Sequence, residues 1–429
     1  MTTASTLNKE QEAAAEALRA FLLPSSKDQF FILSGYAGTG KTYLLSQVLS
    51  RTDKIAFTAP TNKAVKVLAE SCRNAGWANP VCLTIHSLLG LKLSPDGAIK
   101  KLVLPDDAPK IPSFDIVVVD EASMIGKELL DYLIKSIRGV KTKVIFSGDP
   151  AQLPPVGELV SPIWGVHPPF PSASLSEVMR HKNAILDYAT KVRLMISHPA
   201  PRVTPISDYK EDEGVFVAKA PLLQLAKKCA EEFLSPSPPK VVAWRNIAVD
   251  KYNSAIREVL FEDSHSKQFL PTDRVILTEP AMGTEEGIGL LASTDDEGVV
   301  LGVEKTERLG IPCYNLQILL DTNKKVDLVV PTKNGMVEIR KQKDQLASSA
   351  KAGAIPWTMF WEFHESFHYV RHAYAITAHR SQGSTYRKVL VDIHDIMRNR
   401  NTKECIHCLY VASTRASKQL VFSSTPTII

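Results

Sequence analysis

The chain has little of what membrane-spanning or secreted proteins require. No apolar run approaches the roughly 18 residues needed to cross a bilayer. Only 6 of the 429 residues are cysteine, and the first residues, Met1 to Thr6, do not resemble a secretory signal. These absences argue against membrane insertion and against a disulfide-built fold. We therefore expect an intracellular, cytoplasmic protein.

Neither sign of charge dominates the composition. The chain carries 51 Lys and Arg against 46 Asp and Glu, and its net charge of +5 favours a polyanionic partner only weakly. With 44% hydrophobic and 23% charged residues, it is not expected to be disordered. Its length exceeds the roughly 250 to 300 residues at which single cores stop growing, so we expect more than one domain.

The cysteines offer one fragment of a metal site. Cys405-Ile406-His407-Cys408 has no second Cys/His pair at the spacing of a zinc site. We therefore expect no structural zinc, and buried or half-buried thiols instead.

A glycine-rich octet is the strongest functional signal. Residues 35–42 read Gly-Tyr-Ala-Gly-Thr-Gly-Lys-Thr directly after the apolar run 30–33, so a strand is expected to turn sharply into a helix there. The backbone N–H groups of such a loop cradle phosphates, its lysine neutralises their charge, and its last hydroxyl binds Mg²⁺. The predicted ATP-binding residues are Gly35, Ala37, Gly38, Thr39, Gly40, Lys41 and Thr42.

A pair of carboxylates complements this loop. The apolar stretch 116–119 ends in Asp120 and Glu121, an arrangement that places one acid on the metal and the next beside the attacking water. We expect Asp120 to share Mg²⁺ with Thr42 and Glu121 to be the general base. Such a pair alone could end an ordinary strand, but together with the phosphate loop it predicts an ATPase.

Strand and helix patterns alternate through most of the chain. Repeated strand–helix units predict parallel sheets with helices on both faces, which is an α/β fold. A second α/β region is expected to begin near Lys240. The expected helices lie at 7–22, up to Cys72 and at 127–137, and the expected strands lie at 55–59, 116–119, 144–149, 240–244 and 389–393.

Two stretches break this alternation. Between Gly90 and Phe114, the turn signal Ser94-Pro95-Asp96-Gly97 separates short apolar runs and predicts an inserted β-hairpin. From about Phe269 to Ile339, short apolar runs are separated by Gly, Asp, Asn and Pro, which predicts a small β-barrel-like insertion.

Polar groups also follow other expected strands. The segment 57–65 carries hydroxyl, amide and amine groups that could bind successive phosphates of a nucleic acid, and the segment 84–89 around His86 offers another such set. The candidate residues of the first segment are Pro60, Thr61, Asn62 and Lys63. In the segment 148–155, the amide of Gln152 is placed to sense the γ-phosphate and orient water.

The ordered motifs, continued by 374–385 and 409–416, resemble those of superfamily 1B DNA helicases, most closely the Dda and RecD-like branch. The resemblance extends from Leu7 to Leu420, nearly the whole chain. It implies two RecA-like domains that bind ATP between them and move 5′ to 3′ on single-stranded DNA.

The resemblance also assigns roles by position. It implies that Gln11 contacts adenine and that Arg415 is an arginine finger from the second domain. Near the γ-phosphate it places Gln152, Arg180 and Gln382. Gln382 and Gly383 are further expected ATP-binding residues, and Thr377 and His379 are added for nucleic-acid binding. The predicted catalytic residues are thus Lys41, Glu121, Gln152, Arg180 and Arg415.

Some of these residues have simpler interpretations. Arg180 could be a solvated cation at a helix end, and His86 and His379 could be loop histidines with structural hydrogen bonds. An aromatic cluster could stack on bases, but its spacing favours a buried helix face. Its members are Trp357, Phe360, Trp361, Phe363 and Phe367.

The resemblance divides the chain into four parts. Residues 1–187 form the first RecA-like domain, in which the hairpin 90–114 is the expected strand-separating wedge. Residues 188–268 and 371–429 form the second RecA-like domain, and 269–370 an SH3-like insertion. The hairpin carries Ile99 and Leu102 where an aromatic residue would stack on a base pair, and no motif assigns a role to 290–320.

The predicted function is an ATP- and Mg²⁺-dependent DNA helicase that acts as a monomer on single-stranded DNA and on junctions with duplex. Single-strand-binding or replication proteins are candidate partners. One alternative is a DNA-dependent translocase that remodels protein–DNA complexes without unwinding. Another is a non-catalytic DNA-binding module, against which the intact Lys41, Glu121 and Arg415 argue.

Overall fold

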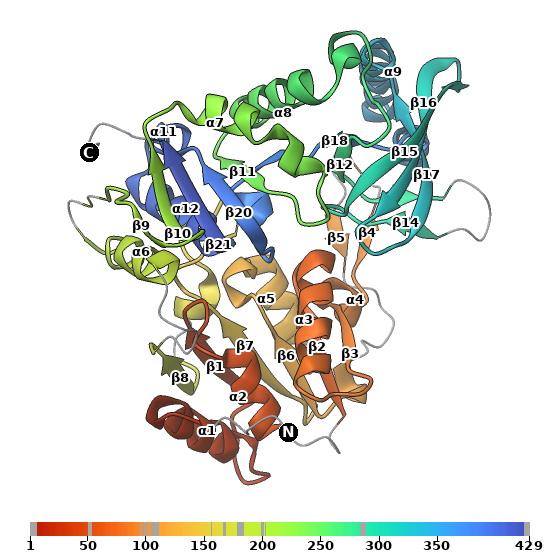
Figure 1. Ribbon diagram of the computed structural model, residues 1–429. Coiled ribbons are helices and arrows are strands. Elements are labelled where there is room, and N and C mark those ends of the chain that lie inside the picture. The colour runs from red at the N-terminus through yellow and green to blue at the C-terminus, as the bar shows by residue number, and fades with distance from the viewer. Residues whose placement is uncertain are drawn as a thin grey trace.

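The computed structural model describes residues 7–49, 54–94, 97, 101–103, 111–155, 157–165, 169–177, 184–198, 201, 203–283 and 289–423. Within these residues, two six-stranded sheets covered by helices lie beside a five-stranded antiparallel sheet (Figure 1). The predicted α/β class with parallel RecA-like sheets is confirmed. No helix in the described parts of the chain is both long and apolar enough to cross a membrane.

The first sheet has the order β3-β2-β6-β7-β1-β8, and all its pairs are parallel. Its strands are apolar without alternation because both faces are buried: Phe31 and Val118 face one core, while Ile32 and Val117 face the other. Its elements are α1 (Lys9–Leu22), β1 (Phe30–Gly35), α2 (Lys41–Val48), β2 (Ile55–Ala59), α3 (Asn62–Asn74), β3 (Val81–Thr84), α4 (Ile85–Leu89), β6 (Ile116–Val119), α5 (Lys127–Ile137), β7 (Lys143–Gly148) and β8 (Ser172–Leu175).

The second sheet has the order β19-β11-β20-β21-β10-β9, in which only the β9 pair is antiparallel. Strands β11 and β20, expected near 240–244 and 389–393, lie side by side in it. Its elements are α6 (Ala184–Leu194), β9 (Asp208–Lys210), β10 (Glu213–Ala218), α7 (Leu222–Lys228), β11 (Lys240–Ala243), α8 (Asn246–Leu260), β19 (Ala375–Thr377), β20 (Tyr386–Val391), α11 (Ile393–Ile396), α12 (Thr402–Thr414) and β21 (Ala416–Ser423).

Single-turn helices occur in the connections: η1 (Ile111–Ser113), η2 (Ala122–Met124), η3 (Pro162–Gly165), η4 (Ala230–Leu234), η5 (Glu262–His265) and η6 (His379–Ser381).

The insertion between β11 and β19 contains the antiparallel sheet β17-β16-β15-β12-β18, the pair β13-β14 and two helices. Strands were predicted as far as Ile339, but a helix begins at Lys333. The reason is local, because the Thr332 side chain caps this helix by accepting from the Gly335 amide. The elements are β12 (Arg274–Leu277), β13 (Ala281–Met282), β14 (Leu290–Ala292), β15 (Glu297–Arg308), β16 (Ile311–Leu320), β17 (Lys325–Pro331), α9 (Lys333–Lys351), α10 (Trp357–Glu365) and β18 (Val370–His372).

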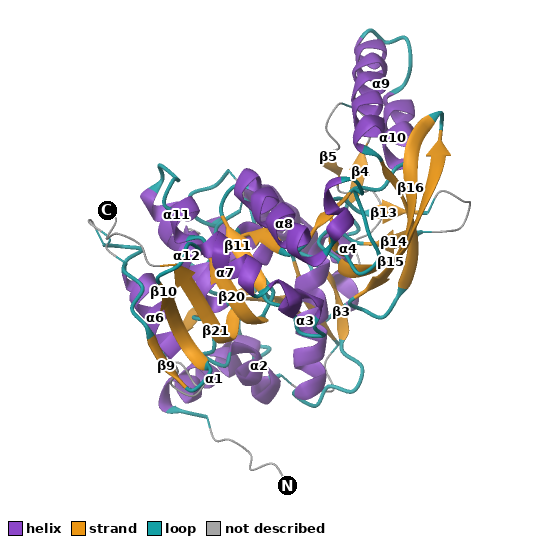
Figure 2. Cartoon of the chain, turned by 45° about the horizontal axis from the view of Figure 1, so that its top comes forward, coloured by secondary structure: helices purple, strands orange, loops and turns teal. Residues whose placement is uncertain are grey.

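Strands β4 (Lys92–Ser94) and β5 (Lys101–Val103) form the antiparallel hairpin expected between Gly90 and Phe114. Both strands lie close to the insertion in the two views (Figures 1 and 2). A hydrogen bond joins the hairpin to the insertion, because the Trp361 indole nitrogen on α10 donates to the Gly97 carbonyl at 3.0 Å. Ile99 lies outside the described residues.

Two of the predicted domain limits fall inside regular elements. The limit between 187 and 188 cuts α6, whose residues Ile185 and Tyr188 pack into the core of the second sheet. The limit between 370 and 371 cuts β18, which pairs with β12 of the insertion. The second RecA-like unit therefore begins at or before Ala184, and the insertion extends to His372.

The aromatic cluster lies on α10 and just after it. Phe360 and Phe367 are buried, as expected for a packed helix face. All six cysteines are free thiols, and Cys405 and Cys408 are buried on α12. The Cys408 sulfur lies within 4.8 Å of donor atoms of His379 and Glu404, so the absence of zinc stays a prediction.

Candidate active site

The phosphate loop connects β1 to α2 in the first domain. Gly38 and Gly40 have φ angles of 82° and 83°, a left-handed conformation that glycine adopts without strain. At Gly35, a Cβ atom would lie 2.7 Å from the Thr39 hydroxyl and 3.1 Å from Leu175, so only glycine fits. These glycines hold the loop in the shape that places its N–H groups and the N-terminus of α2 around an anion.

Lys41 is directed into this loop. Its ammonium donates to the Gly35 carbonyl at 2.6 Å and to the Tyr36 carbonyl at 3.3 Å. Gln11, the expected adenine contact, lies beside the loop and donates to the Thr39 carbonyl at 3.1 Å. The other end of the same amide accepts from the Asn8 backbone in a capping box at the start of α1. Gln11 therefore braces the loop in this structure.

The residues predicted to hold Mg²⁺ offer the oxygen donors that this ion prefers. Asp120 follows β6, and its Oδ1 accepts a hydrogen bond from the Ser147 hydroxyl on β7 at 2.9 Å. Thr42 lies in the first turn of α2, and within the described residues its hydroxyl has no hydrogen-bond partner. An oriented carboxylate after β6 and an unbonded hydroxyl at the start of α2 therefore suit a hard cation.

Glu121 is the residue whose chemistry the site alters most. It follows Asp120 with a left-handed φ of 52°, a conformation that few non-glycine residues adopt. Burial, reinforced by the neighbouring Asp120, raises the pKa of Glu121 to about 7, while Arg415 and Lys41 oppose the rise. A carboxylate with a pKa near neutrality is suited to take a proton from water.

This pKa predicts a pH dependence for ATP hydrolysis. Because only the ionised carboxylate can accept a proton, kcat/KM should fall about tenfold per pH unit below pH 7 and level off above it. The measurement is DNA-stimulated ATP hydrolysis below KM from pH 5.5 to 8.5, with DNA binding followed over the same range as a control. A flat profile between pH 6 and 8 would contradict the assignment of Glu121 as base.

Arg415 of the second domain is, besides Lys41, the other cation that acts on the pKa of Glu121. It directly follows α12, and its guanidinium donates to the carbonyls of Val411 at 3.1 Å and Ser384 at 3.0 Å and to the Thr414 hydroxyl at 3.0 Å. Its side chain is buried, yet among the described residues no carboxylate lies within ion-pairing distance of it. A buried arginine held by neutral acceptors keeps its charge available for an anion.

Two other predicted γ-phosphate residues, Gln152 and Gln382, lie in the described part of the chain. Gln152 is buried, and no described residue bonds its Oε1, so this atom has unused hydrogen-bonding capacity. Gln382 is also buried, and its amide donates to the Leu153 carbonyl across the interface at 3.3 Å. Arg180 lies outside the described residues, so its role stays a prediction.

The sequence analysis missed a direct link between the phosphate loop and the second domain. Asp149 accepts from the Ala37 amide of the loop at 3.1 Å and from the Tyr410 hydroxyl on α12 at 2.7 Å. In addition, the Arg193 guanidinium of α6 lies 3.4 Å from the centre of the Tyr36 ring. Asp149 and Tyr410 belong to motifs noted in the sequence, but their separation of 261 residues hides the contact.

Two of the three segments predicted to bind nucleic acid meet across the domain interface. A Cβ atom on Gly383 would lie 3.5 Å from Ala64, so the segment 377–383 faces the start of α3. Two of the polar side chains already have local roles. Thr61 caps α3 by accepting from the Ala64 amide, and the Thr377 hydroxyl accepts from the Arg380 amide. Pro60 and Asn62 are half-buried beside them.

The remaining predicted contacts differ in their surroundings. Burial lowers the pKa of both His86 and His379. His379 lies 3.9 Å from Glu404, and His86 lies on the short helix α4. Lys63 is engaged by Glu297 of the insertion at 3.0 Å and therefore is not a free cation in this structure.

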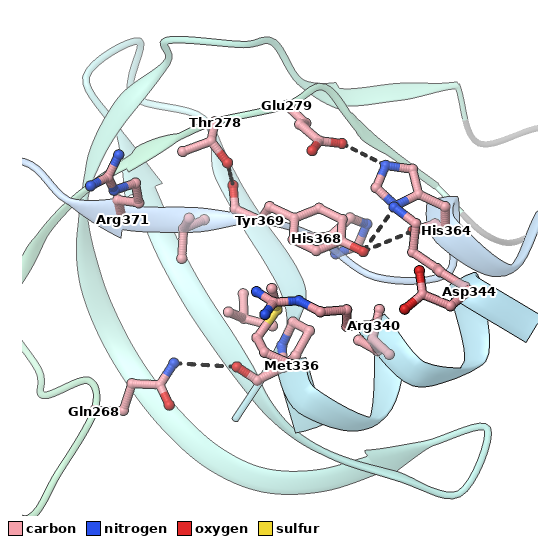
Figure 3. A pocket seen from close by; sticks show the side chains of 15 residues that line it. Gln268, Thr278, Glu279, Met336, Arg340, Asp344, His364, His368, Tyr369 and Arg371 are labelled. Atoms are coloured by element: carbon pink, nitrogen blue, oxygen red, sulfur yellow. Dashed lines mark hydrogen bonds and ion pairs between the residues drawn. The ribbon is translucent and has the colours of Figure 1, made fainter. Parts of the chain in front are cut away.

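A separate pocket of about 570 Å³ lies within the insertion, away from the phosphate loop (Figure 3). His364 bonds Glu279 at 2.7 Å, and its other ring nitrogen lies 3.0 Å from the Tyr369 hydroxyl. The same nitrogen lies 3.0 Å from the ammonium of Lys343, whose pKa burial lowers. These contacts fasten α9 and α10 to the antiparallel sheet.

This geometry defines a class of protein. A phosphate loop and paired carboxylates on one parallel α/β domain meet a buried arginine of a second such domain, which is the arrangement of an ATP-hydrolysing P-loop enzyme with two RecA-like domains. Comparisons with known proteins narrow the class. Residues 6–202 match the AAA domain family, and residues 372–423 match the UvrD-like helicase C-terminal domain.

Similar proteins cover nearly the whole chain. An uncharacterised protein of Acanthamoeba polyphaga mimivirus is 25% identical over 97% of this chain and 99% of its own length. The ATP-dependent DNA helicase dda of Enterobacteria phage T4 is 24% identical over 92% of each chain. A Pif1 helicase structure from Bacteroides, in complex with ADP-AlF3 and single-stranded DNA, has the same fold with a TM-score of 0.54 at 16% identity, over 99% of this chain and 94% of that one.

The two family matches and these relatives support a superfamily 1 helicase of the Pif1, Dda and RecD-like kind, as the motifs predicted. The chain is an enzyme of the ATP-dependent DNA helicase class.

Proposed function

We propose that this protein hydrolyses ATP to move 5′ to 3′ along single-stranded DNA and to separate the strands of a duplex ahead of it. The observation that supports this most is the position of Glu121 near cations of both domains, since Lys41 from its own domain and Arg415 from the other both oppose the rise in its pKa. A general base influenced by cations of both domains lies where closure of the cleft can control hydrolysis.

The proposed cycle depends on charges shared across the cleft. The phosphates of ATP would be balanced by Lys41 on one side and by Arg415 on the other, which favours the closed arrangement. When bound, Mg²⁺ would be held by Thr42 and Asp120 and would neutralise phosphate charge. Hydrolysis and release weaken this bridge, so the two domains can move relative to each other.

The contacts missed by the sequence analysis fit the same cycle. Because Asp149 binds both the Ala37 amide and the Tyr410 hydroxyl, a change in the phosphate loop reaches α12 directly. Helix α12 ends at Thr414, next to Arg415. We infer that this link couples nucleotide binding to the position of the arginine. Since both halves of the site lie on one chain, we propose a monomeric motor.

The strand-separating element in this proposal is the hairpin β4-β5. Helix α10 braces it through the hydrogen bond from Trp361 to the Gly97 carbonyl. The Trp361 ring contacts His364, which the insertion holds through Glu279 and Tyr369. A chain of contacts thus connects the antiparallel sheet to the hairpin, so the hairpin can resist the duplex even without an aromatic tip.

A single substitution tests the brace. Trp361→Phe keeps an aromatic ring but removes the donor, so duplex unwinding should fall about 3- to 10-fold while single-stranded DNA still stimulates ATP hydrolysis normally. Stopped-flow measurement of unwinding beside translocation checks this. Trp357→Phe is the matched control, because Trp357 lies one turn earlier on α10 and makes no hydrogen bond to the described residues of the hairpin. Equal loss of unwinding and translocation would show that the hairpin only braces the first domain.

A direct assay tests the proposed function. ATP hydrolysis should be slow alone and should rise many-fold with single-stranded DNA, since DNA is expected to bind across both domains and favour cleft closure. Duplex DNA without a tail should stimulate less. Hydrolysis that is indifferent to DNA would contradict a DNA motor. Stimulation without any strand separation would favour a translocase that remodels protein–DNA complexes.

A further inference from the structure

Three consecutive carboxylates of the insertion each pair with a cation of the motor domains. Asp295 and Asp296 lie just before β15, and Glu297 is the first residue of this strand. Asp295 lies 3.1 Å from Arg380 of the second domain. Asp296 lies 2.5 Å from Lys66, and Glu297 lies 3.0 Å from Lys63, both on α3 of the first domain. This acidic turn, residues 295–297, therefore touches both motor domains at once.

The inner end of the acidic turn is fixed. The second oxygen of Glu297 accepts from the buried Lys240 ammonium at 2.8 Å, and the Tyr386 hydroxyl donates to the first at 3.1 Å. Although burial would raise the pKa of Glu297, Lys240 and Lys63 hold it well below the ordinary range. Glu297 is thus an ionised anchor.

The outer end is less constrained. The Lys66 and Arg380 side chains are 44% and 31% exposed, against 10% for Asp296 and 22% for Asp295, so the cation of each pair is open to solvent and salt while its carboxylate is largely covered. Asp295 has a left-handed φ of 64°, a conformation that few non-glycine residues adopt. Burial raises the pKa of Asp295, whereas Arg380 and Lys63 oppose the rise. The carboxylates of this end are therefore held to the motor domains mainly by charge.

The cations on the motor side lie where a nucleic-acid backbone is expected. Lys63 and Lys66 occupy the first two turns of α3, directly after Thr61. Arg380 lies between Thr377 and Gly383, in the segment that faces α3 across the interface. A row of cations contributed by two motor domains is the usual means of holding successive phosphates.

We propose that Lys66 and Arg380 join Lys63 in a phosphate-binding row for single-stranded DNA, and that the acidic turn occupies this row in the unbound protein. The inference rests on the proposed function, because it assumes that a DNA strand crosses the same interface. Carboxylates on one backbone segment present successive negative charges, as a strand does. To bind, the DNA phosphates must replace the carboxylates of Asp295 and Asp296 as partners of Arg380 and Lys66. The acidic turn therefore weakens DNA binding, while Glu297 keeps the insertion attached to the motor domains.

The test neutralises the outer carboxylates one at a time. Asp296→Asn keeps an oxygen that can accept from the Ser293 amide, as Asp296 does at 2.9 Å, so folding should be preserved. With nucleotide-free protein and a fluorescent oligothymidine, the affinity should rise about 3- to 10-fold in low salt. Asp295→Asn should act in the same direction. Asp327→Asn is the matched control, because it removes the same charge from an exposed site on β17 that makes no ion pair with the described motor residues.

A second pair of variants tests the cation. Lys66→Gln should weaken oligothymidine binding more in the Asp296→Asn background than in the parent, because only there is the ammonium free for phosphate. Equal effects in both backgrounds, or Asp295→Asn and Asp296→Asn proteins that bind like the Asp327→Asn control, would overturn the competition. A parent protein that binds no oligothymidine would instead overturn the proposed function itself. Thermal unfolding of each variant establishes that the fold is intact.

Discussion

Replacing Arg415 by Ala is expected to slow DNA-stimulated ATP hydrolysis by about 10³- to 10⁵-fold, the range found for arginine fingers. The guanidinium is buried, has no carboxylate partner among the described residues and influences the pKa of Glu121 from the other domain. Its effect should be largest in the transition state, so ATP affinity should change much less than single-turnover hydrolysis. Because Arg415 also opposes the raised pKa of Glu121, its loss should shift the acidic limb of the pH profile upward.

Two further variants make this result interpretable. Arg415→Lys keeps the charge but not the guanidinium that donates to Val411, Ser384 and Thr414, so it should recover only part of the rate. Arg387→Ala removes an exposed arginine from the same domain and should leave hydrolysis unchanged. If Arg415→Ala lost ATP affinity while single-turnover hydrolysis stayed normal, the arginine would bind nucleotide without acting in catalysis.

Replacing Glu121 by Gln is expected to lower the hydrolysis rate by about 10²- to 10⁴-fold, the usual contribution of a general base. The substitution keeps the shape of the side chain and removes a carboxylate that burial disfavours, so thermal stability should not fall. Binding of ATP and DNA should persist. Stopped-flow phosphate release measures the rate directly.

Glu128→Gln on α5 is the matched control, because Glu128 is an exposed carboxylate of the same domain. Lys41→Ala should also abolish turnover, since it removes the ammonium that lies inside the phosphate loop. Hydrolysis by Glu121→Gln within a few-fold of the parent would mean that another group activates the water.

Local patterns predicted the strands and the glycine-rich turn of the first α/β domain well. The continuous apolar runs of β1, β2 and β6 indicated strands buried on both faces, and the sheet has them. The glycines of residues 35–42 required the tight strand-to-helix turn that the structure shows. Asp120 and Glu121 could be placed because they directly follow a strand whose end is fixed by the sheet.

Contacts between distant segments could not be predicted in this way. Tyr410 reaches Asp149, and the acidic turn 295–297 reaches α3, because three folded units pack together. The spacing of apolar residues along the sequence does not predict contacts between such distant residues. The Lys63 side chain illustrates the consequence: its position after Thr61 indicated a phosphate contact, but only the packed insertion supplies the carboxylate that binds it here. Helix α9 was missed because the apolar residues around 326–339 also suit a strand.

The most direct test of the account is strand separation on tailed duplexes. With ATP and Mg²⁺, the protein should unwind a duplex that carries a 5′ single-stranded tail and should leave the matching 3′-tailed duplex intact. The Glu121→Gln protein should bind both substrates and unwind neither. Unwinding of the 3′-tailed duplex instead would contradict the proposed direction, and unwinding by Glu121→Gln at the parent rate would contradict the coupling of strand separation to ATP hydrolysis at this site.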